Sequence, residues 1–331
     1  MTVAGTRAPG APRLWQPPAE RTLRRLAVAS LLSQIGIVVS GGAVRLTGSG
    51  LGCPQVPRCT DDSLVPTPEM GIHGLIEFGN RLLTFVLVAI AAATVLAVLR
   101  TLRSDRPRRD LLVPAMVLLA GVPVQAMIGM VTVWSSLNPW VVMLHFMCSV
   151  ALIAVATILV RRAQRAAGAS PREIGSPWLR RLATTVLVAA FGTIYLGTVV
   201  TGSGPHAGDP SSPRTGLDLE SVAQLHADAV ALLFGLSVGL YFAARAVGSP
   251  GRAAQAALVL VGVEAGQAVV GIVQYALDLP VLLVGLHMLG AAVLVAAAVD
   301  AWLAARWMSA LTRPHWSGRS RHPVPQPGAS P

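Results

Sequence analysis

The sequence has no lysine, and only 12% of its 331 residues carry a charge. All 26 basic residues are therefore arginines, which leave a formal net charge of +11. Hydrophobic residues make up 53% of the chain, and many of them are gathered in long apolar runs. Several of these runs are long enough to cross a bilayer, so the sequence predicts a polytopic membrane protein and argues against a soluble domain.

The distribution of the arginines argues against a nucleic-acid partner. In a soluble protein such an excess of positive charge would suggest nucleic acid. Here the arginines lie mainly between the apolar runs, where they set the topology of membrane helices and contact anionic lipid headgroups. We therefore expect no nucleic-acid partner and a lipid bilayer in its place.

The apolar runs predict an all-α membrane protein with eight transmembrane helices. Their expected ranges are 22–44, 71–100, 110–134, 139–162, 178–201, 220–247, 252–277 and 280–308. The segments 1–21 and 309–331 are rich in proline, glycine and other small residues, so they are expected to be disordered cytoplasmic tails. The first apolar run is too long for the core of a secretory signal, and we expect no cleavable signal peptide.

Arginine counts predict the orientation of the helices. With the loops assigned to alternate sides of the eight spans, 22 arginines fall on the side that holds both termini. The opposite side has three, which are Arg45, Arg58 and Arg214. Because positive residues are retained in the cytoplasm, both termini are expected to be cytoplasmic.

Polar residues of the third and seventh helices recur with one spacing. Gln125 and Gln267 begin similar short segments, and a histidine preceded by leucine follows each of them, at His145 and His287. The two histidines are separated by the same number of positions as the two glutamines. Since one offset relates both features, the sequence predicts an internal repeat.

A loop motif supports the repeat and defines its two copies. The motif Thr-Gly-Ser-Gly at 47–50 recurs at 201–204. Each copy has four helices, an even number, so both copies enter the membrane in the same direction. We therefore expect two parallel four-helix bundles, an N-terminal unit over 22–162 and a C-terminal unit over 178–308, joined by a cytoplasmic linker over 163–177.

A polar stripe opens the second helix. At about 100° per residue, the side chains of His73, Glu77, Asn80 and Arg81 fall within an arc of roughly 100°. An ionisable group costs ~2.5–3.5 kcal/mol near the bilayer centre, so the stripe needs a reason. It is either a functional site that faces the bundle interior or an ion pair of Glu77 with Arg81 that locks helices together.

Four histidines, His73, His145, His226 and His287, lie near the outer ends of the even-numbered helices. These helices run in one direction, so the imidazoles should share one depth in the membrane. Zinc prefers four convergent ligands, commonly with Cys, Asp or Glu among them, whereas these histidines come as one pair per unit. Two imidazoles on facing helices suit haem, and the expected metal is iron.

Together these residues resemble the haem A synthase family over about 22–308. The similarity lies in the loop Thr-Gly-Ser-Gly-Leu-Gly-Cys-Pro at 47–54, the Ile-Glu-Phe step at Glu77, the Gln-Leu-His step at His226 and the Leu-His steps at His145 and His287. The resemblance implies a membrane oxidoreductase in the bacterial plasma membrane. It implies oxidation of a methyl group of haem O to a formyl group, by successive hydroxylations that use O2, for the assembly of terminal oxidases.

The resemblance also implies roles for single residues. His226 and His287 would be the axial ligands of haem b in the C-terminal unit, and His145 would serve the substrate haem in the N-terminal unit. Glu77 would be the catalytic carboxylate, with Arg81 beside it. The implied cofactor is haem b, with haem O as substrate and O2 as co-substrate. Candidate partners are the enzyme that produces haem O, an electron donor of the quinol type and a second copy of the chain.

Asn80 departs from the family pattern Glu-x-x-His-Arg, because it stands where a histidine is expected. Asparagine is a poor haem ligand, and the catalytic cluster here is Glu77, Asn80 and Arg81. His73, two turns outward on the same face, is one candidate to replace the missing ligand. The other is an open position opposite His145, which suits an oxygenase because O2 needs a free coordination site.

Cys53 and Cys59 lie in the first outer loop, where an oxidising compartment favours a disulfide between them. The pair is either a loop staple or a thiol couple that passes electrons to the substrate haem, as suggested for the family. Residues 202–219 contain no second pair, so a relay that needs two pairs is not expected.

Other polar residues of the helices have a simpler explanation. Gln125, Gln267 and Glu264 lie within apolar runs. In membrane proteins such side chains form hydrogen bonds to a neighbouring helix. We expect interhelical hydrogen bonds from them and no chemistry.

Two other functions compete with a haem A synthase. A di-haem b-type electron-transfer cytochrome, linked to quinol, explains the four histidines but gives Glu77 no task. A transporter built on parallel repeats would place polar groups at the membrane midplane, whereas the cluster around Glu77 lies near the outer end of its helix.

Overall fold

The computed structural model describes residues 18–165, 172–173, 176–247 and 251–308 of the chain. Within these residues, eight helices are long and apolar enough to cross a membrane. They are α1 (Glu20–Leu46), α2 (Gly71–Thr101), α3 (Leu112–Trp134), α4 (Pro139–Ala163), α5 (Pro177–Ser203), α6 (Leu219–Ala246), α7 (Gly251–Ala276) and α8 (Val281–Arg306). The prediction of an all-α protein with eight membrane helices is confirmed, with small differences at the helix ends.

Short elements that the sequence did not predict flank these helices. The 3₁₀ turns η2 (Pro68–Met70) and η3 (Arg109–Leu111) precede α2 and α3. The strands β1 (Arg172–Glu173) and β2 (Trp307–Met308) pair antiparallel. This pairing joins the segment between α4 and α5 to the residues that follow α8, so the eighth predicted helix ends slightly early.

The predicted tails lie almost entirely outside the described residues, which begin at residue 18 and end at residue 308. The exception is the end of the first tail, since α1 already begins at Glu20. An early start is favourable there because the acidic side chain of Glu20 lies in the first helical turn, at the positive end of the helix dipole.

Side-chain caps define the starts of three helices. Asn138 and Ser176 each accept a hydrogen bond from a backbone N–H in the first turn of α4 and α5. At the start of α6, the Asp218 carboxylate accepts the backbone N–H of Ser221 at 2.8 Å. This hydrogen bond favours the ionised form and lowers the pKa of Asp218. The cap is therefore present at neutral pH and is lost as the pH falls through that lowered value.

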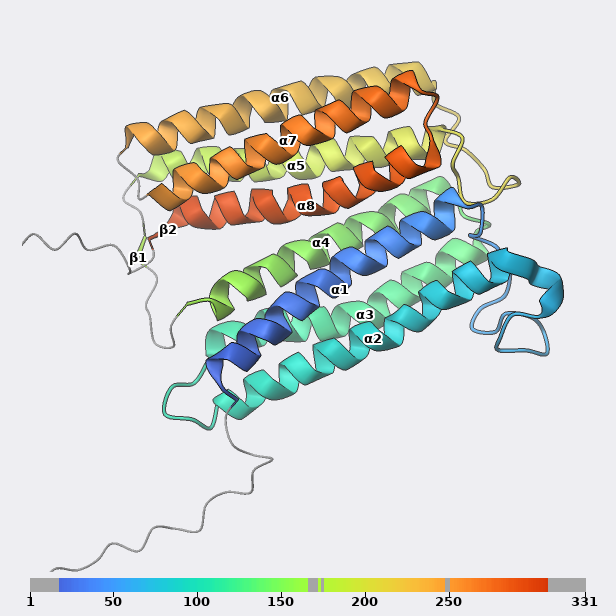
Figure 1. Ribbon diagram of the computed structural model, residues 1–331, viewed down its shortest axis with the longest axis horizontal. Helices are drawn as coiled ribbons and strands as arrows, with labels where there is room; N and C mark the ends of the chain where they lie inside the picture. Colours follow the sequence, from blue (N-terminus) through green and yellow to red (C-terminus); the bar gives the residue numbers. More distant parts are fainter. Residues whose placement is uncertain (1–17, 166–171, 174–175, 248–250, 309–331) are drawn as a thin grey trace, which may run out of the picture.

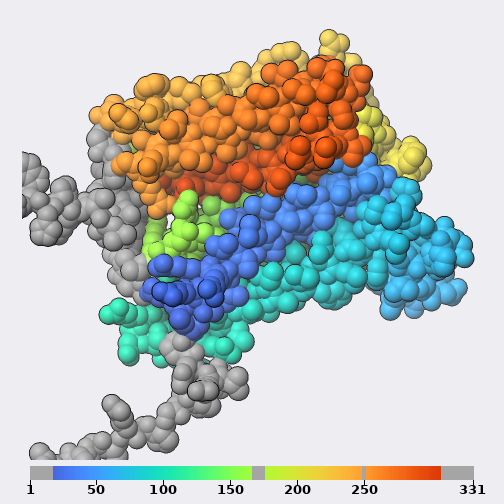
Figure 2. Space-filling model, viewed as in Figure 1, coloured from blue at the N-terminus to red at the C-terminus, as the bar shows by residue number. Residues whose placement is uncertain are grey.

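The helices pack as two bundles, α1–α4 and α5–α8 (Figure 1). In each bundle every helix packs against the next one along the chain, and the first packs against the last. The bundles meet because α8 packs against α1 and α4, and α5 packs against α4. Figure 2 shows this contact along α1, the blue helix in the middle of the view.

One tight turn occurs at corresponding places in both bundles. Ser136 and Leu137, between α3 and α4, have φ of 51° and 59°, and Asp278 and Leu279, between α7 and α8, have 58° and 59°. In each turn the leucine N–H donates to a carbonyl of the preceding helix, at 2.8 and 2.7 Å. The separation of the two turns along the chain equals that of the repeated glutamines and histidines.

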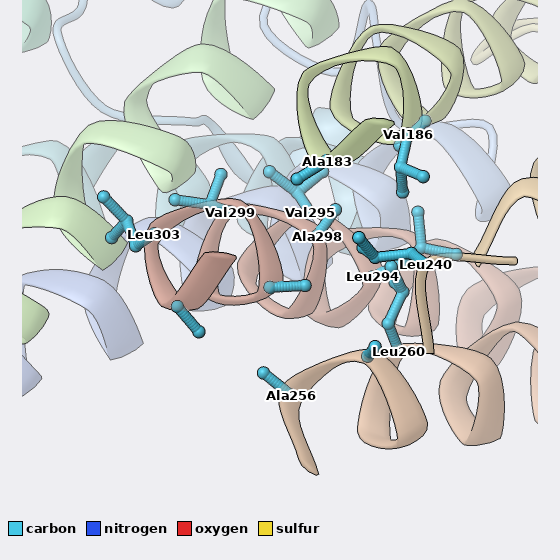
Figure 3. Close-up of a cluster of buried hydrophobic side chains, with 14 of the residues drawn as sticks. Ala183, Val186, Leu240, Ala256, Leu260, Leu294, Val295, Ala298, Val299 and Leu303 are labelled. Atoms are coloured by element: carbon cyan, nitrogen blue, oxygen red, sulfur yellow. The ribbon is translucent and has the colours of Figure 1, made fainter. Parts of the chain in front are cut away.

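The buried core of the second bundle uses many small side chains. Figure 3 shows part of it, with Ala183 and Val186 of α5, Leu240 of α6, Leu260 of α7 and Val295 of α8. Small residues let helix backbones approach closely, and close packing is the main attraction between helices in a bilayer.

An ion-pair network ties the bundles together at the end of α4 and α8 and the start of α7. Arg161 of α4 donates to both carboxylate oxygens of Asp300 of α8, at 2.5 and 2.6 Å. Arg252 of α7 reaches the same carboxylate at 3.1 Å. Asp300 thus connects one helix of the first bundle with two helices of the second.

Candidate functional site

A cavity of about 1,680 Å³ runs through both bundles, and all eight membrane helices contribute to its lining. This volume exceeds that of a pocket for one small ligand, which is ~300–1,000 Å³. Six of the predicted site residues line it. They are Glu77, Asn80, Arg81, His145, His226 and His287.

Glu77 is nearly buried, with 5% of its surface exposed, although it carries a carboxylate. One oxygen, Oε2, accepts the backbone N–H of Cys53 at 2.7 Å. The other, Oε1, pairs with the Arg81 guanidinium, with Nε at 3.1 Å and a closer contact from Nη2. Both oxygens of the carboxylate therefore have partners, and the Arg81 guanidinium balances its negative charge beside the cavity.

Arg81 binds the backbone of the loop between α1 and α2 as well as Glu77. Its Nη2 donates to the carbonyl of Cys53 at 2.8 Å, and its Nη1 donates to the carbonyls of Gln55 at 3.1 Å and Arg58 at 3.3 Å. The ion pair of Glu77 with Arg81 thus exists, but it fastens the α1–α2 loop to α2 and does not join two membrane helices.

The predicted disulfide between Cys53 and Cys59 is confirmed. Both cysteines are completely buried. The backbone N–H of Cys59 donates to the carbonyl of Ser63 at 2.9 Å and closes the loop. Since Cys53 also supplies the N–H that Glu77 accepts, the disulfide holds together the loop that positions the carboxylate.

Gly52 is the point at which this loop touches α2, and it leads to a testable prediction. A Cβ atom at Gly52 would overlap the backbone carbonyl of His73, which cannot move without shifting the helix. We expect Gly52→Ala to cost about 1–3 kcal/mol of stability and to lower the thermal unfolding temperature of the purified protein. Gly36→Ala, on α1 where nothing lies within 4 Å of the added methyl, is the matched control. Equal unfolding temperatures for the two variants would contradict this contact.

Asn80 and His73 lie in different surroundings. Asn80 lines the cavity, and its Oδ1 accepts the hydroxyl of Ser40 on α1 at 2.7 Å. His73 is exposed in the first turn of α2, and its Nδ1 is hydrogen-bonded to the Ser49 hydroxyl at 2.9 Å. It is not among the described residues that line the cavity. The structure therefore groups Asn80, and not His73, with the other site residues.

His226 is oriented by a backbone carbonyl. Its Nδ1 lies 3.0 Å from the carbonyl oxygen of Thr193 on α5. A carbonyl can only accept, so Nδ1 carries the proton and Nε2 keeps its lone pair. A metal-binding histidine commonly has this arrangement, in which an acceptor at one ring nitrogen fixes the tautomer and leaves the other nitrogen for the metal.

His145 and His287 line the cavity with a buried Nδ1 that has no hydrogen-bond partner among the described residues. Each ring packs against a glycine of the neighbouring helix. A Cβ on Gly129 or Gly271 would lie 3.6 or 3.3 Å from the Cε1 atom of His145 or His287. In both residues the Nδ1 atom is covered by protein, which leaves Nε2 as the ring nitrogen available to a ligand in the cavity.

These features fit haem better than a bare metal ion. Within the described residues, no group of three or more His, Cys, Asp or Glu side chains could hold a metal ion. Haem iron needs only one or two axial ligands from the protein. The imidazoles of His145, His226 and His287, set in a mostly apolar cavity, could supply them.

The sequence did not indicate the residues that orient this cluster. Ser40 and Thr193 act through a hydroxyl and a carbonyl, and neither stands out among many similar residues in apolar helices. Gly197, one turn beyond Thr193, was a residue from which the contact of α5 with the His226 ring could have been predicted. A Cβ there would lie 3.1 Å from the Cε1 atom of His226, which is a tight contact, so glycine leaves room for the imidazole ring.

Glu264 makes the interhelical hydrogen bond that was expected of it. Its Oε1 accepts the hydroxyl of Ser237 on α6 at 2.8 Å. Gln125 likewise donates to the carbonyl of His145 at 3.2 Å. Gln267 packs its amide against the backbone of Gly290 on α8. All three residues also line the cavity, which the sequence did not show.

Comparison with known proteins adds a family to this geometry. Residues 24–299 match the family model COX15-CtaA, described as cytochrome oxidase assembly protein. The chain is 31% identical to a heme A synthase of Bacillus pumilus (strain SAFR-032) over 140 residues, which are 42% of this chain and 43% of that protein. It is 32% identical to a heme A synthase of Lysinibacillus sphaericus (strain C3-41) over 188 residues, 54% of this chain and 58% of that protein. The matched segments thus span about half the length of these relatives.

Proposed function

Because the chain belongs to the COX15-CtaA family of cytochrome oxidase assembly proteins, we propose that it is a haem A synthase. The reaction oxidises a methyl group of haem O to a formyl group by successive O2-dependent hydroxylations, and its product serves terminal oxidases. The observation that carries the proposal is the shared cavity onto which the Glu77–Arg81 pair and three imidazoles open. The names of the two relatives agree with it.

The two bundles have different tasks in this proposal. His226 and His287 would hold haem b in the C-terminal unit, where two imidazoles face the cavity. The N-terminal unit contributes one imidazole, that of His145, together with Glu77. An oxygenase needs a free coordination site whereas an electron-transfer haem does not, and this asymmetry supports the assignment.

The surroundings of Asn80 and His73 bear on whether the substrate haem has an open coordination position or a replacement ligand from His73. Asn80 lines the cavity at the position of the family histidine, while His73 is bound to Ser49 outside the lining. We therefore favour an open position, with His145 as the protein ligand, over a replacement ligand from His73. A bound haem would supply the redox chemistry and the activation of O2.

Glu77 acts on the substrate carbon in this mechanism. The carboxylate borders the cavity from the second helix, fixed by Arg81 and by the Cys53 N–H. From there it stabilises positive charge that develops on the carbon, or accepts the proton of a hydroxylated intermediate. The disulfide of Cys53 with Cys59 has the role of a staple, because it holds the loop that orients Glu77.

The topology completes the proposal. The recurrence of one tight turn at the offset of the repeated glutamines and histidines supports two parallel units, α1–α4 and α5–α8. The excess of arginine between the spans supports cytoplasmic termini in the bacterial plasma membrane. The enzyme that makes haem O, a quinol-type electron donor and a second copy of the chain are the proposed partners.

Pigment analysis tests the function. The full chain is expressed in cells that also express a haem O-producing enzyme, and the haems are extracted and separated. Haem A should appear only when the chain is present. A stable b-type spectrum without haem A would favour the di-haem electron-transfer cytochrome, and a protein without haem would favour a transporter.

A further inference from the structure

Glu264 is a buried carboxyl group that the proposed function does not use. It lies in the middle of α7, with 3% of its surface exposed, and its partner Ser237 is completely buried. Ser237 donates to Oε1 at 2.8 Å, whereas Oε2 is buried and has no partner among the described residues. Glu264 also lines the cavity.

The carboxyl group is specific to the second bundle. Val122 occupies the corresponding position of the first bundle, at the offset that relates the two glutamines, and it lines the cavity too. A packing role would be filled equally well by an apolar residue in both bundles. The difference therefore assigns Glu264 to a task that only the C-terminal unit has.

The charge of Glu264 is not compensated as that of Glu77 is. Glu77 has the Arg81 guanidinium and a backbone N–H, while Glu264 has one hydroxyl. Within the described parts of α6, α7 and α8, no arginine is among the residues that line the cavity. The protonation state of a carboxyl group in such a place depends strongly on any other charge that enters the cavity.

Glu264 and His287 face the same space. Gly271, which packs against the His287 ring, lies two turns further along α7, about 10 Å along the helix axis. Gln267 and Gln274 lie on this face of α7 and line the cavity between Glu264 and the outer end of the helix. These polar side chains offer a route by which a proton can reach Glu264.

We propose that Glu264 is a proton-binding site coupled to reduction of the haem held by His226 and His287. The inference rests on the proposed function. One electron from a reductant, a mediator dye in the experiment below, adds one negative charge to the cavity. One proton from water then converts the Glu264 carboxylate to the acid, which compensates that charge.

Other titratable and charged groups on the helices packed against α7 need to be distinguished from Glu264. They are Glu220, His226, Asp228, Tyr241 and Arg245 on α6, and His287, Asp300 and Arg306 on α8. Of these, Glu220, His226 and His287 line the cavity. The two histidines are the proposed iron ligands, which leaves Glu220 as the competing carboxylate. It is exposed at the outer end of α6.

A potentiometric titration of the purified holoprotein at a series of pH values tests the proposal. In the wild type, the midpoint potential of the b-type haem should fall as the pH rises, by up to ~59 mV per pH unit for one proton per electron. Glu264→Gln, which keeps the shape of the side chain, should remove most of this slope. Glu220→Gln is the matched control and should keep it. Any dependence of the midpoint potential on pH that remains in Glu264→Gln would come from the carboxylic acid groups of the haem itself.

Infrared spectroscopy of the wild type gives a second test that needs no variant to fold. The reduced-minus-oxidised difference spectrum should contain the carbonyl stretch of a newly protonated carboxylic acid. Its absence, or an equal slope in wild type and Glu264→Gln, would overturn the inference. A wild-type protein that binds no b-type haem would instead contradict the proposed function on which the inference rests.

Discussion

The His287→Ala variant is expected to lose the b-type haem of the purified protein. His287 lines the cavity, its Nδ1 has no partner among the described residues, and Gly271 leaves room for its ring. In the proposed function His287 is one of two haem ligands, and its removal would leave the haem held by His226 alone. We expect at least a tenfold decrease in the ratio of haem absorbance to protein in the purified sample, and haem A formation should cease.

Two further variants separate ligation from folding. His287→Met keeps an axial ligand of the kind found in haem proteins, so it should retain haem with an altered spectrum. His206→Ala removes an imidazole of the α5–α6 loop that is hydrogen-bonded to the Leu279 carbonyl and is not among the described residues that line the cavity, and it should retain haem fully. Full haem retention by His287→Ala would show that this imidazole is not a ligand.

The membrane helices could be predicted from the sequence because one property defines them. A bilayer requires about 20 consecutive apolar residues, and a run of that length is visible without any knowledge of tertiary contacts. The histidines could be found for a related reason. Polar residues are rare in such runs, so each of His145, His226 and His287 stands out from its surroundings, and each lines the cavity.

The partners of these residues could not be predicted, because they act through common groups. The Glu77 carboxylate accepts a backbone N–H of Cys53, and every non-proline residue has such a group. Asn80 is oriented by Ser40, one of several serines of α1. Which hydroxyl or amide comes close depends on the crossing of two helices and on the path of the α1–α2 loop, and neither can be read from local sequence patterns.

For His73, helical periodicity predicted the correct face of α2 but not the surroundings of the side chain. It lies on the same helical face as Glu77 and Asn80, one and two turns before them. However, α2 begins at Gly71, so His73 lies in its first turn, where the loop between α1 and α2 supplies Ser49 as a partner. Helical periodicity gives the direction of a side chain, but not how far the cavity extends along the helix.

The Glu77→Gln variant is expected to keep its haem and lose haem A formation. The substitution preserves shape and removes the negative charge that Arg81 and the Cys53 N–H hold beside the cavity. A positioned acid–base group contributes about 10²–10⁴-fold to a reaction rate, so haem A in extracted pigment should fall by at least about 100-fold. The absorbance of the b-type haem should not change. Glu69→Gln, an exposed carboxylate just before α2, is the matched control and should behave as the wild type.

A purely structural role for Glu77 predicts a different pattern. In that case the ion pair with Arg81 would serve only to fasten the α1–α2 loop, and loss of either partner would leave the other charge unpaired. The single variants Glu77→Gln and Arg81→Gln would then lower the unfolding temperature, and the double variant would recover both stability and haem A formation. For a catalytic Glu77, the double variant stays inactive even where it regains stability, because no carboxylate remains beside the substrate carbon. Haem A production by the double variant at the wild-type level would therefore reduce Glu77 to a fastening residue.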